Sequence, residues 1–130
     1  MNEIEQRFYD AFINESVNPD NVLDCSLEIK EQVEVGPYRI DFVINDKYAI
    51  EIDGHGYHST KEQRSNDYCR ERYLIKCGFI VIRYMATEIF MHSHRCAQEV
   101  IYIVIDLTVK QEVEAFESYK RIVERRCPNG

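Results

Sequence analysis

The sequence feature that most constrains the fold is a pair of short apolar segments joined by a tight turn. Residues 38–44 and 47–53 are rich in β-branched and aromatic side chains, and Asn45-Asp46 lies between them. Such side chains favour strands, and an Asn-Asp pair favours a hairpin turn. Gly54 follows the second segment and is expected to end the strand. The pattern therefore predicts two adjacent antiparallel strands.

The flanking sequence predicts the other elements of an α/β fold. Asn2, followed three residues later by Glu5, is typical of a helix start. Gly78 suits the end of a helix, and the almost wholly apolar segment after it suggests a central, buried strand. The order α-β-β-β-α-β-α predicts a mixed sheet flanked by helices. The expected ranges are a helix over 2–14, a strand over 27–35, a helix over 61–77, a strand over 79–84 and helices in two or three pieces over 86–126.

Length and charge bound the class of protein. The chain has 130 residues, which suits a single domain over 1–130. Its net charge of −7 argues against an unspecific nucleic-acid binder, which normally has a basic face. The charge is uneven, since residues 1–58 carry thirteen acidic and four basic side chains. Any contact with nucleic acid is therefore expected from the second half.

The sequence also excludes several classes. No apolar run approaches the roughly 20 residues that span a membrane, and the polar start does not resemble a signal peptide. Five cysteines without a C-x-x-C pair argue against a disulfide framework and favour a reducing cytoplasm. Cys69 and Cys77 are expected to be buried. His92, His94 and Cys96 alternate as in a soft-metal site, although a polar helix start is favoured because no fourth ligand is evident.

Carboxylates lie inside the predicted hairpin. Glu51 and Asp53 are two residues apart, so they point to the same face of a strand. Their apolar neighbours make two like charges costly unless a cation lies between them. Asp41, on the preceding strand, is expected near the level of Glu51. Because carboxylates suit hard cations, the pattern predicts a site for Mg²⁺, with Mn²⁺ as a substitute, formed by Asp41, Glu51 and Asp53.

His58 follows a glycine-containing loop just past this strand, where an imidazole can accept a proton from water. His55 is a nearer alternative. A structural interpretation also exists, in which Asp53 is a turn residue before Gly54 and Asp41 is a hydrogen-bonded buried carboxylate. It explains Glu51 poorly.

Three stretches carry a resemblance to a known family. They are GPYRIDF at 36–42, IEIDG followed by YH within 50–58, and D-x-x-R-x-x-x-L-x-x-x-GF-x-V-x-R at 67–83. Together they resemble a small endonuclease-like family related to very-short-patch mismatch-repair endonucleases, in the PD-(D/E)xK restriction-endonuclease-like superfamily. The resemblance runs from about Ile4 to Ile89.

The resemblance implies roles for the acidic residues. Asp41 matches the metal-binding Asp of the superfamily, and Glu51 matches the acidic member of its (D/E)xK motif. Asp53 stands where the superfamily commonly has Lys, which removes the usual candidate for activating water. His58 matches the general base of the mismatch-repair enzymes.

The resemblance also extends to charged residues outside the hairpin. Glu5 matches a family Glu that faces the site, but it also suits the helix cap. Asp67 and Arg70 match the family's D-x-x-R pair, although a surface salt bridge is an equal alternative. Arg83, on a strand expected to be buried, requires an anionic partner, either a site carboxylate or a phosphate.

The favoured hypothesis is a metal-dependent endonuclease that hydrolyses phosphodiester bonds in DNA. Phosphate contacts are expected from Lys61, Arg64, Arg70 and Arg72. One alternative is a catalytically inactive nuclease-fold module that binds nucleic acid or a partner protein. Another is a purely structural protein. A C-terminal helical extension over 94–126 carries more apolar residues than one packed face needs, which suggests a homodimer or a larger defence or repair partner.

Overall fold

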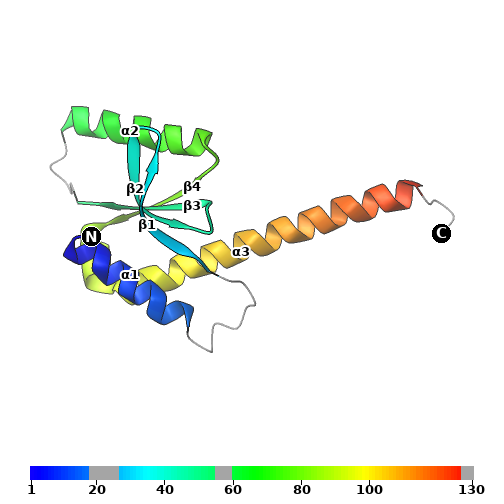
Figure 1. The fold of residues 1–130 in the computed structure, drawn as a ribbon, viewed down its shortest axis with the longest axis horizontal. Helices are drawn as coiled ribbons and strands as arrows, with labels where there is room; N and C mark the ends of the chain where they lie inside the picture. Colours follow the sequence, from blue (N-terminus) through cyan, green and yellow to red (C-terminus); the bar gives the residue numbers. More distant parts are fainter. Residues whose placement is uncertain (18–26, 55–59, 127–130) are drawn as a thin grey trace.

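The computed structural model describes residues 1–17, 27–54 and 60–126. Within these ranges the elements follow the predicted order (Figure 1). They are α1 (Glu3–Ser16), β1 (Ile29–Val35), β2 (Tyr38–Ile44), β3 (Tyr48–Asp53), α2 (Lys61–Lys76), β4 (Ile80–Met85) and α3 (Ala86–Arg126).

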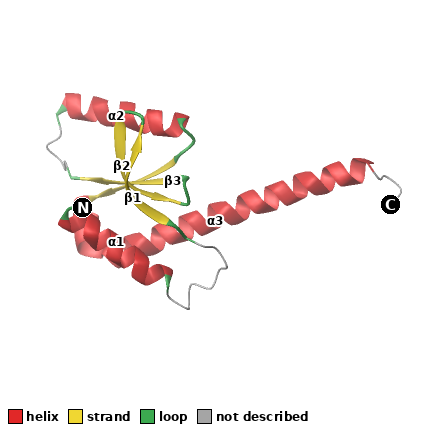
Figure 2. Ribbon diagram, in the orientation of Figure 1, coloured by secondary structure: helices red, strands yellow, loops and turns green. Residues whose placement is uncertain are grey.

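The four strands form one mixed sheet in the order β1-β2-β3-β4. β2 pairs antiparallel with both β1 and β3, and β4 runs parallel to β3. α2 covers one face of this sheet, and α1 with the first part of α3 covers the other (Figure 2). The predicted α/β fold with a helix-flanked mixed sheet is confirmed.

The prediction that residues 79–84 form a central strand is wrong, because β4 lies at the edge of the sheet that the structure describes. Its apolar character has another cause. Ile80 and Ile82 pack toward α1 and α3, and Val81 packs toward α2. Two covered faces, and not two neighbouring strands, explain the continuous apolar run.

The core has two parts, one on each face of the sheet. The larger part joins the sheet to α1 and α3, and the smaller part joins it to α2. Fully buried members of the larger part include Phe8 and Phe12 of α1, Phe42, Ile44 and Ile50 of the sheet, and Ile89 and Val100 of α3. The smaller part consists of Ile40, Val43, Ala49 and Leu74.

Local sequence signals act where they were expected. Asn2 and Glu5 form a reciprocal capping box at the start of α1. Asn45 and Asp46 have φ values of 52° and 56°, as the tight turn between β2 and β3 requires. Gly78, with φ of 93°, follows the last turn of α2.

The expected burial of Cys69 and Cys77 is wrong, because both side chains are exposed. Leu74 is the buried residue of α2. Most positions on this helix therefore face solvent, and a cysteine there gains no apolar environment.

The backbone is irregular at Gln32 of β1 and at Asp41 of β2, which lie at the same level of the sheet. Gln32 has φ of 50°, which is unusual for a residue other than glycine on a strand. The register continues across it, with Glu31 opposite Phe42 and Val33 opposite Ile40. Ile40 nevertheless joins the core under α2 and Phe42 joins the core under α1, although residues two apart on a regular strand share a face. Asp41 therefore lies at the point where the alternation of side chains between the two faces of β2 is broken.

α3 is a long helix with a kink at His92. Of the extension expected over 94–126, the part up to Ile105 packs in the core, whereas every residue from 109 to 126 is exposed. The exposed part projects from the body (Figure 1). His94 contacts the buried Glu15 and Cys96 lies in the core, so the kink region has structural partners. The helices in the described ranges lack the continuous apolar stretch that a membrane span requires.

Candidate functional site

The acidic residues line a cavity of about 390 Å³ between the sheet and α2, close to the start of α1. Among the described residues, six carboxylates and three guanidinium groups surround it, so this part of its wall carries an excess of negative charge. The acidic residues are Glu5, Asp41, Glu51, Asp53, Asp67 and Glu71, and the basic residues are Arg39, Arg70 and Arg83.

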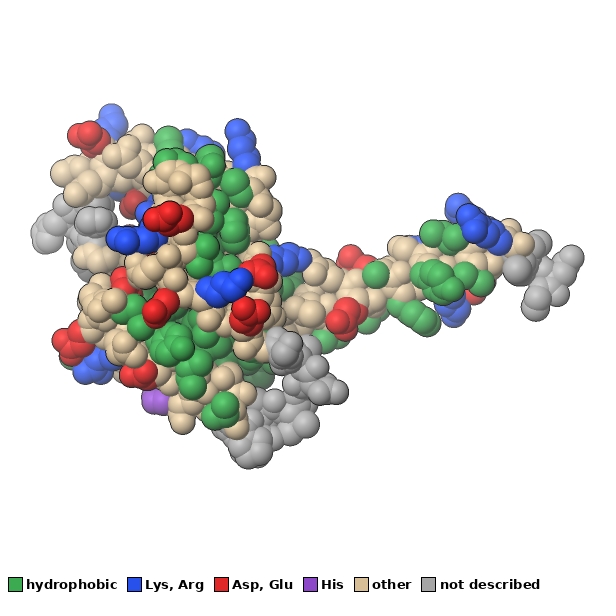
Figure 3. All heavy atoms as spheres, viewed as in Figure 1, with side chains coloured by type: hydrophobic (Ala, Val, Ile, Leu, Met, Phe, Trp, Pro, Cys, Tyr) green, Lys and Arg blue, Asp and Glu red, His purple; other side chains and the backbone are tan. Residues whose placement is uncertain are grey.

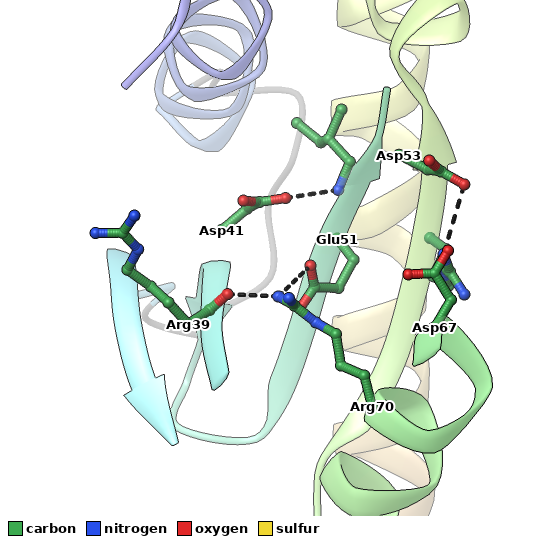
Figure 4. Close-up of polar contacts among 8 residues, drawn as sticks. Arg39, Asp41, Glu51, Asp53, Asp67 and Arg70 are labelled. Carbon is green, nitrogen blue, oxygen red and sulfur yellow. Dashed lines mark hydrogen bonds and ion pairs between the residues drawn. The ribbon is translucent and has the colours of Figure 1, made fainter. Parts of the chain in front are cut away.

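Asp41 bridges β2 and β3 with its side chain. The β2–β3 register has Phe42 opposite Ile50 at this end, and the next free donor on β3, the Ile52 N–H, donates to Asp41 Oδ2 at 2.8 Å (Figure 4). Burial raises the pKa of Asp41, and the Ile52 N–H acts against this shift. The hydrogen bond satisfies one oxygen of a largely desolvated carboxylate.

Glu51 points from β3 toward α2. Its side chain is 12% exposed, and Arg70 Nη2 donates to both of its oxygens, at 2.8 and 3.0 Å. Arg70 also donates to the Arg39 carbonyl of β2 (Figure 4). Burial raises the pKa of Glu51 from 4.5 to about 6, although Arg70 favours the charged form. One arginine therefore joins α2 to two strands.

Asp53 and Asp67 share a second arginine. Arg83 Nη2 lies 3.5 Å from Asp53 Oδ2 and 3.6 Å from Asp67 Oδ2. The expectation that Arg83 pairs with a site carboxylate is confirmed. Asp67 and Arg70 each form an ion pair with a residue of the sheet, Asp67 with Arg83 and Arg70 with Glu51 (Figure 4).

Glu5 has both of its expected environments. It closes the cap of α1 through Asn2, and it also lines the cavity and raises the pKa of Asp41 through its charge. Gln32 Nε2 donates to Glu5 Oε2 at 3.2 Å. The sequence pattern does not assign Gln32 and Arg39 to the site, because a positive φ on a strand and a contact through a backbone carbonyl leave no pattern in the residue types.

The structure brings Asp41, Glu51 and Asp53 to one cavity, as the sequence predicted. Within the described ranges, however, no three His, Cys, Asp or Glu side chains converge as a metal-binding group. Glu51 and Asp53 each face an arginine instead. The chemistry of these side chains still suits Mg²⁺, because they are carboxylates in a cavity with excess negative charge. His58 and its alternative His55 lie outside the described residues.

The residues predicted to contact phosphate divide into two groups. Arg70 lies at the cavity, where it holds Glu51. Lys61, Arg64 and Arg72 are exposed on α2. Lys61 and Arg72 lie at nearly opposite helical phase to Arg70, so they face away from the cavity.

Endonuclease-like proteins are similar to this chain in sequence and in fold. A family model described as REase_MTES_1575 matches residues 19–104, and the chain belongs to that family. The structure is also similar to the catalytic domain of the homing endonuclease I-Bth0305I, with a TM-score of 0.57 and 15% sequence identity. The similarity covers 80% of this chain and 97% of that domain. No curated protein matches significantly.

Proposed function

We propose that the protein is a metal-dependent endonuclease that hydrolyses phosphodiester bonds in DNA. The observation that carries the proposal is that Asp41, Glu51 and Asp53 all line one cavity in a chain of the restriction-endonuclease-like class. These residues are the proposed ligands of Mg²⁺ or Mn²⁺. When bound, the metal supplies Lewis-acid polarisation of a phosphoryl oxygen.

The chain's own residues have distinct proposed roles. Arg70 and Arg83, which lie beside the carboxylates, provide charge for the phosphate and for the transition state. Lys61, Arg64 and Arg72 contact the DNA backbone farther away. His58 takes the proton from the attacking water, a role that rests on its place in the sequence just after β3 and on the sequence resemblance. The acidic balance of the chain predicts weak, salt-sensitive unspecific binding. A cytoplasmic location, consistent with free thiols at Cys69 and Cys77, belongs to the same proposal.

Nicking of supercoiled plasmid in Mg²⁺ or Mn²⁺ tests the proposal. Asp41→Asn keeps the shape of the side chain and removes its charge, and we expect it to abolish nicking. Asp46→Asn is the matched control, because Asp46 is exposed in the β2–β3 turn and Asn also suits its positive φ. Equal nicking by the wild type and Asp41→Asn would exclude the proposed site.

One observation favours a second function, a module that binds nucleic acid or a partner protein without cleavage. Glu51 and Asp53 already have arginine partners, so their charge is satisfied without a metal ion. Calorimetry with Mn²⁺ separates the two functions. The nuclease predicts Mn²⁺ binding that Asp41→Asn weakens and Asp46→Asn preserves, whereas the binding module predicts none.

A further inference from the structure

The projecting part of α3 is an amphipathic helix whose apolar face is exposed to solvent. Every residue from 109 to 126 is exposed, and the match to the family ends at residue 104. Most helical stability in proteins comes from packing of an amphipathic face, and intrinsic propensity adds little. This segment has such a face but does not pack it against the body.

Five apolar residues form what we call the apolar stripe. They are Val109, Val113, Phe116, Tyr119 and Val123. Their spacing of three or four residues places them on one side of the helix. Phe116 and Tyr119 are each 66% exposed, and Figure 3 shows hydrophobic side chains along the projecting segment. Burial of this stripe against a partner would remove a large apolar area from water.

The charges on the same segment are unevenly placed along its length. The half nearer the body, residues 106–117, carries four acidic side chains and one basic side chain. The far half, residues 118–126, carries four basic side chains and one acidic side chain. The acidic residues near the body are Asp106, Glu112, Glu114 and Glu117, and the basic residues farther out are Lys120, Arg121, Arg125 and Arg126.

We infer that the apolar stripe binds the same stripe of a second copy of this chain, with the two helices antiparallel. This orientation places the acidic half of each helix beside the basic half of the other, whereas a parallel pair would bring like charges together. Charges beside an apolar seam set partner choice and orientation in coiled coils.

The position of two charged residues supports this pairing. Phe116 is the midpoint of the stripe, and Glu112 and Lys120 lie four residues before and after it, within the arc that the stripe covers. An antiparallel pair centred near Phe116 therefore brings Glu112 of each copy to the level of Lys120 of the other. The two bodies then lie at opposite ends of a helix pair about 30 Å long, at 1.5 Å per residue. This inference does not depend on nuclease activity.

Sedimentation equilibrium of the full chain at about 100 µM tests the inference, since short apolar interfaces associate weakly. We expect a mass of twice 15.5 kDa for the wild type. Phe116→Glu should weaken association about 100-fold, because it places two carboxylates at the centre of the seam. Phe116 lies on an exposed part of α3, so the substitution should leave the free energy of unfolding of the body unchanged.

A charge exchange tests the orientation. Glu112→Lys or Lys120→Glu alone should weaken association about tenfold, and the double variant should restore it. Glu114→Lys is the matched control, because it makes the same charge change on the opposite side of the helix and should have little effect. A monomeric wild type would overturn the inference. A double variant that associates no better than either single variant would overturn the antiparallel arrangement.

Discussion

Phe12 in α1 is fully buried, whereas Phe116 on the projecting helix is 66% exposed. Charged residues differ in the same way. Arg70 and Glu51 form an ion pair at the cavity with side chains 30% and 12% exposed, whereas Lys110 and Asp106 form one on α3 with side chains 65% and 63% exposed. The side chains of the body are thus buried against other parts of the same chain, whereas those of the projecting helix are exposed and available to a partner.

The largest expected effect tests this difference with one substitution made twice. Phe12→Ala should lower the free energy of unfolding by about 3–5 kcal/mol, because it leaves a cavity beside Phe8. Phe116→Ala should change it by less than about 0.5 kcal/mol in dilute, monomeric protein. Urea unfolding followed by circular dichroism measures both. Similar losses for the two variants would show that Phe116 packs against the body.

Arg70→Met should have the next largest effect, a loss of about 2–3 kcal/mol at pH 8. It removes the partner of the buried Glu51 carboxylate and a donor to the Arg39 carbonyl. The loss should shrink at pH 5, where Glu51 can take up a proton. Arg72→Met, on the exposed side of the same helix, is the control and should change stability by less than about 0.5 kcal/mol. Urea unfolding at the two pH values gives the comparison, and equal losses for both variants would contradict it.

A third prediction concerns Glu51 itself, whose pKa rises from 4.5 to about 6 on folding. A carboxyl with a raised pKa binds protons more tightly in the folded state, so stability from Glu51 falls as pH rises from about 4.5 to 6. The loss is about 2 kcal/mol, at 1.36 kcal/mol per pKa unit. Glu51→Gln should remove this part of the pH dependence and be more stable than the wild type at pH 8.

Asp41, whose pKa is also raised, contributes a slope in the same direction that remains in the variant. The prediction therefore concerns the difference in free energy of unfolding between the wild type and Glu51→Gln, measured by urea unfolding across pH 4 to 8. Exposed Glu34 provides the control, since Glu34→Gln should leave the wild-type slope unchanged. Parallel curves for the wild type and Glu51→Gln would refute the proposed role of burial.

The elements that local sequence determines were predicted closely. The cap at Asn2 and Glu5, the positive-φ turn at Asn45-Asp46 and the stop at Gly78 each act within a few residues, so the sequence contains all that they need. The sequence predicts a central strand over 79–84, and the strand is present over 80–85 but lies at the edge of the described sheet. Hydrophobicity reports that both faces of a strand are covered, but it carries no information about how many strands lie beside it.

The candidate site shows the same division. The meeting of Asp41 and Glu51 followed from the length of the turn between their strands, and Asp53 followed from the period of two along β3. The arginine partners depend on how α2 and β4 pack against the sheet, so spacing alone could not assign Arg70 to Glu51 rather than to Asp67. The positive φ of Gln32 depends on the pairing of β1 and β2, and its residue type gives no sign of it.

The smallest predicted effect on stability compares two ion pairs of nearly equal length that differ in burial. Lys110 Nζ lies 2.9 Å from Asp106 Oδ2, nearly the same separation as the 2.8 Å between Arg70 and Glu51. Water and salt screen the exposed pair, and two long side chains lose freedom when they form it, so Lys110→Met should cost at most about 0.5 kcal/mol. Amide hydrogen exchange along α3, at low and high salt, measures this locally. A loss near that of Arg70→Met would mean that the pair is shielded from solvent, and the projecting helix would then be packed against a partner at Lys110 as well as along the apolar stripe.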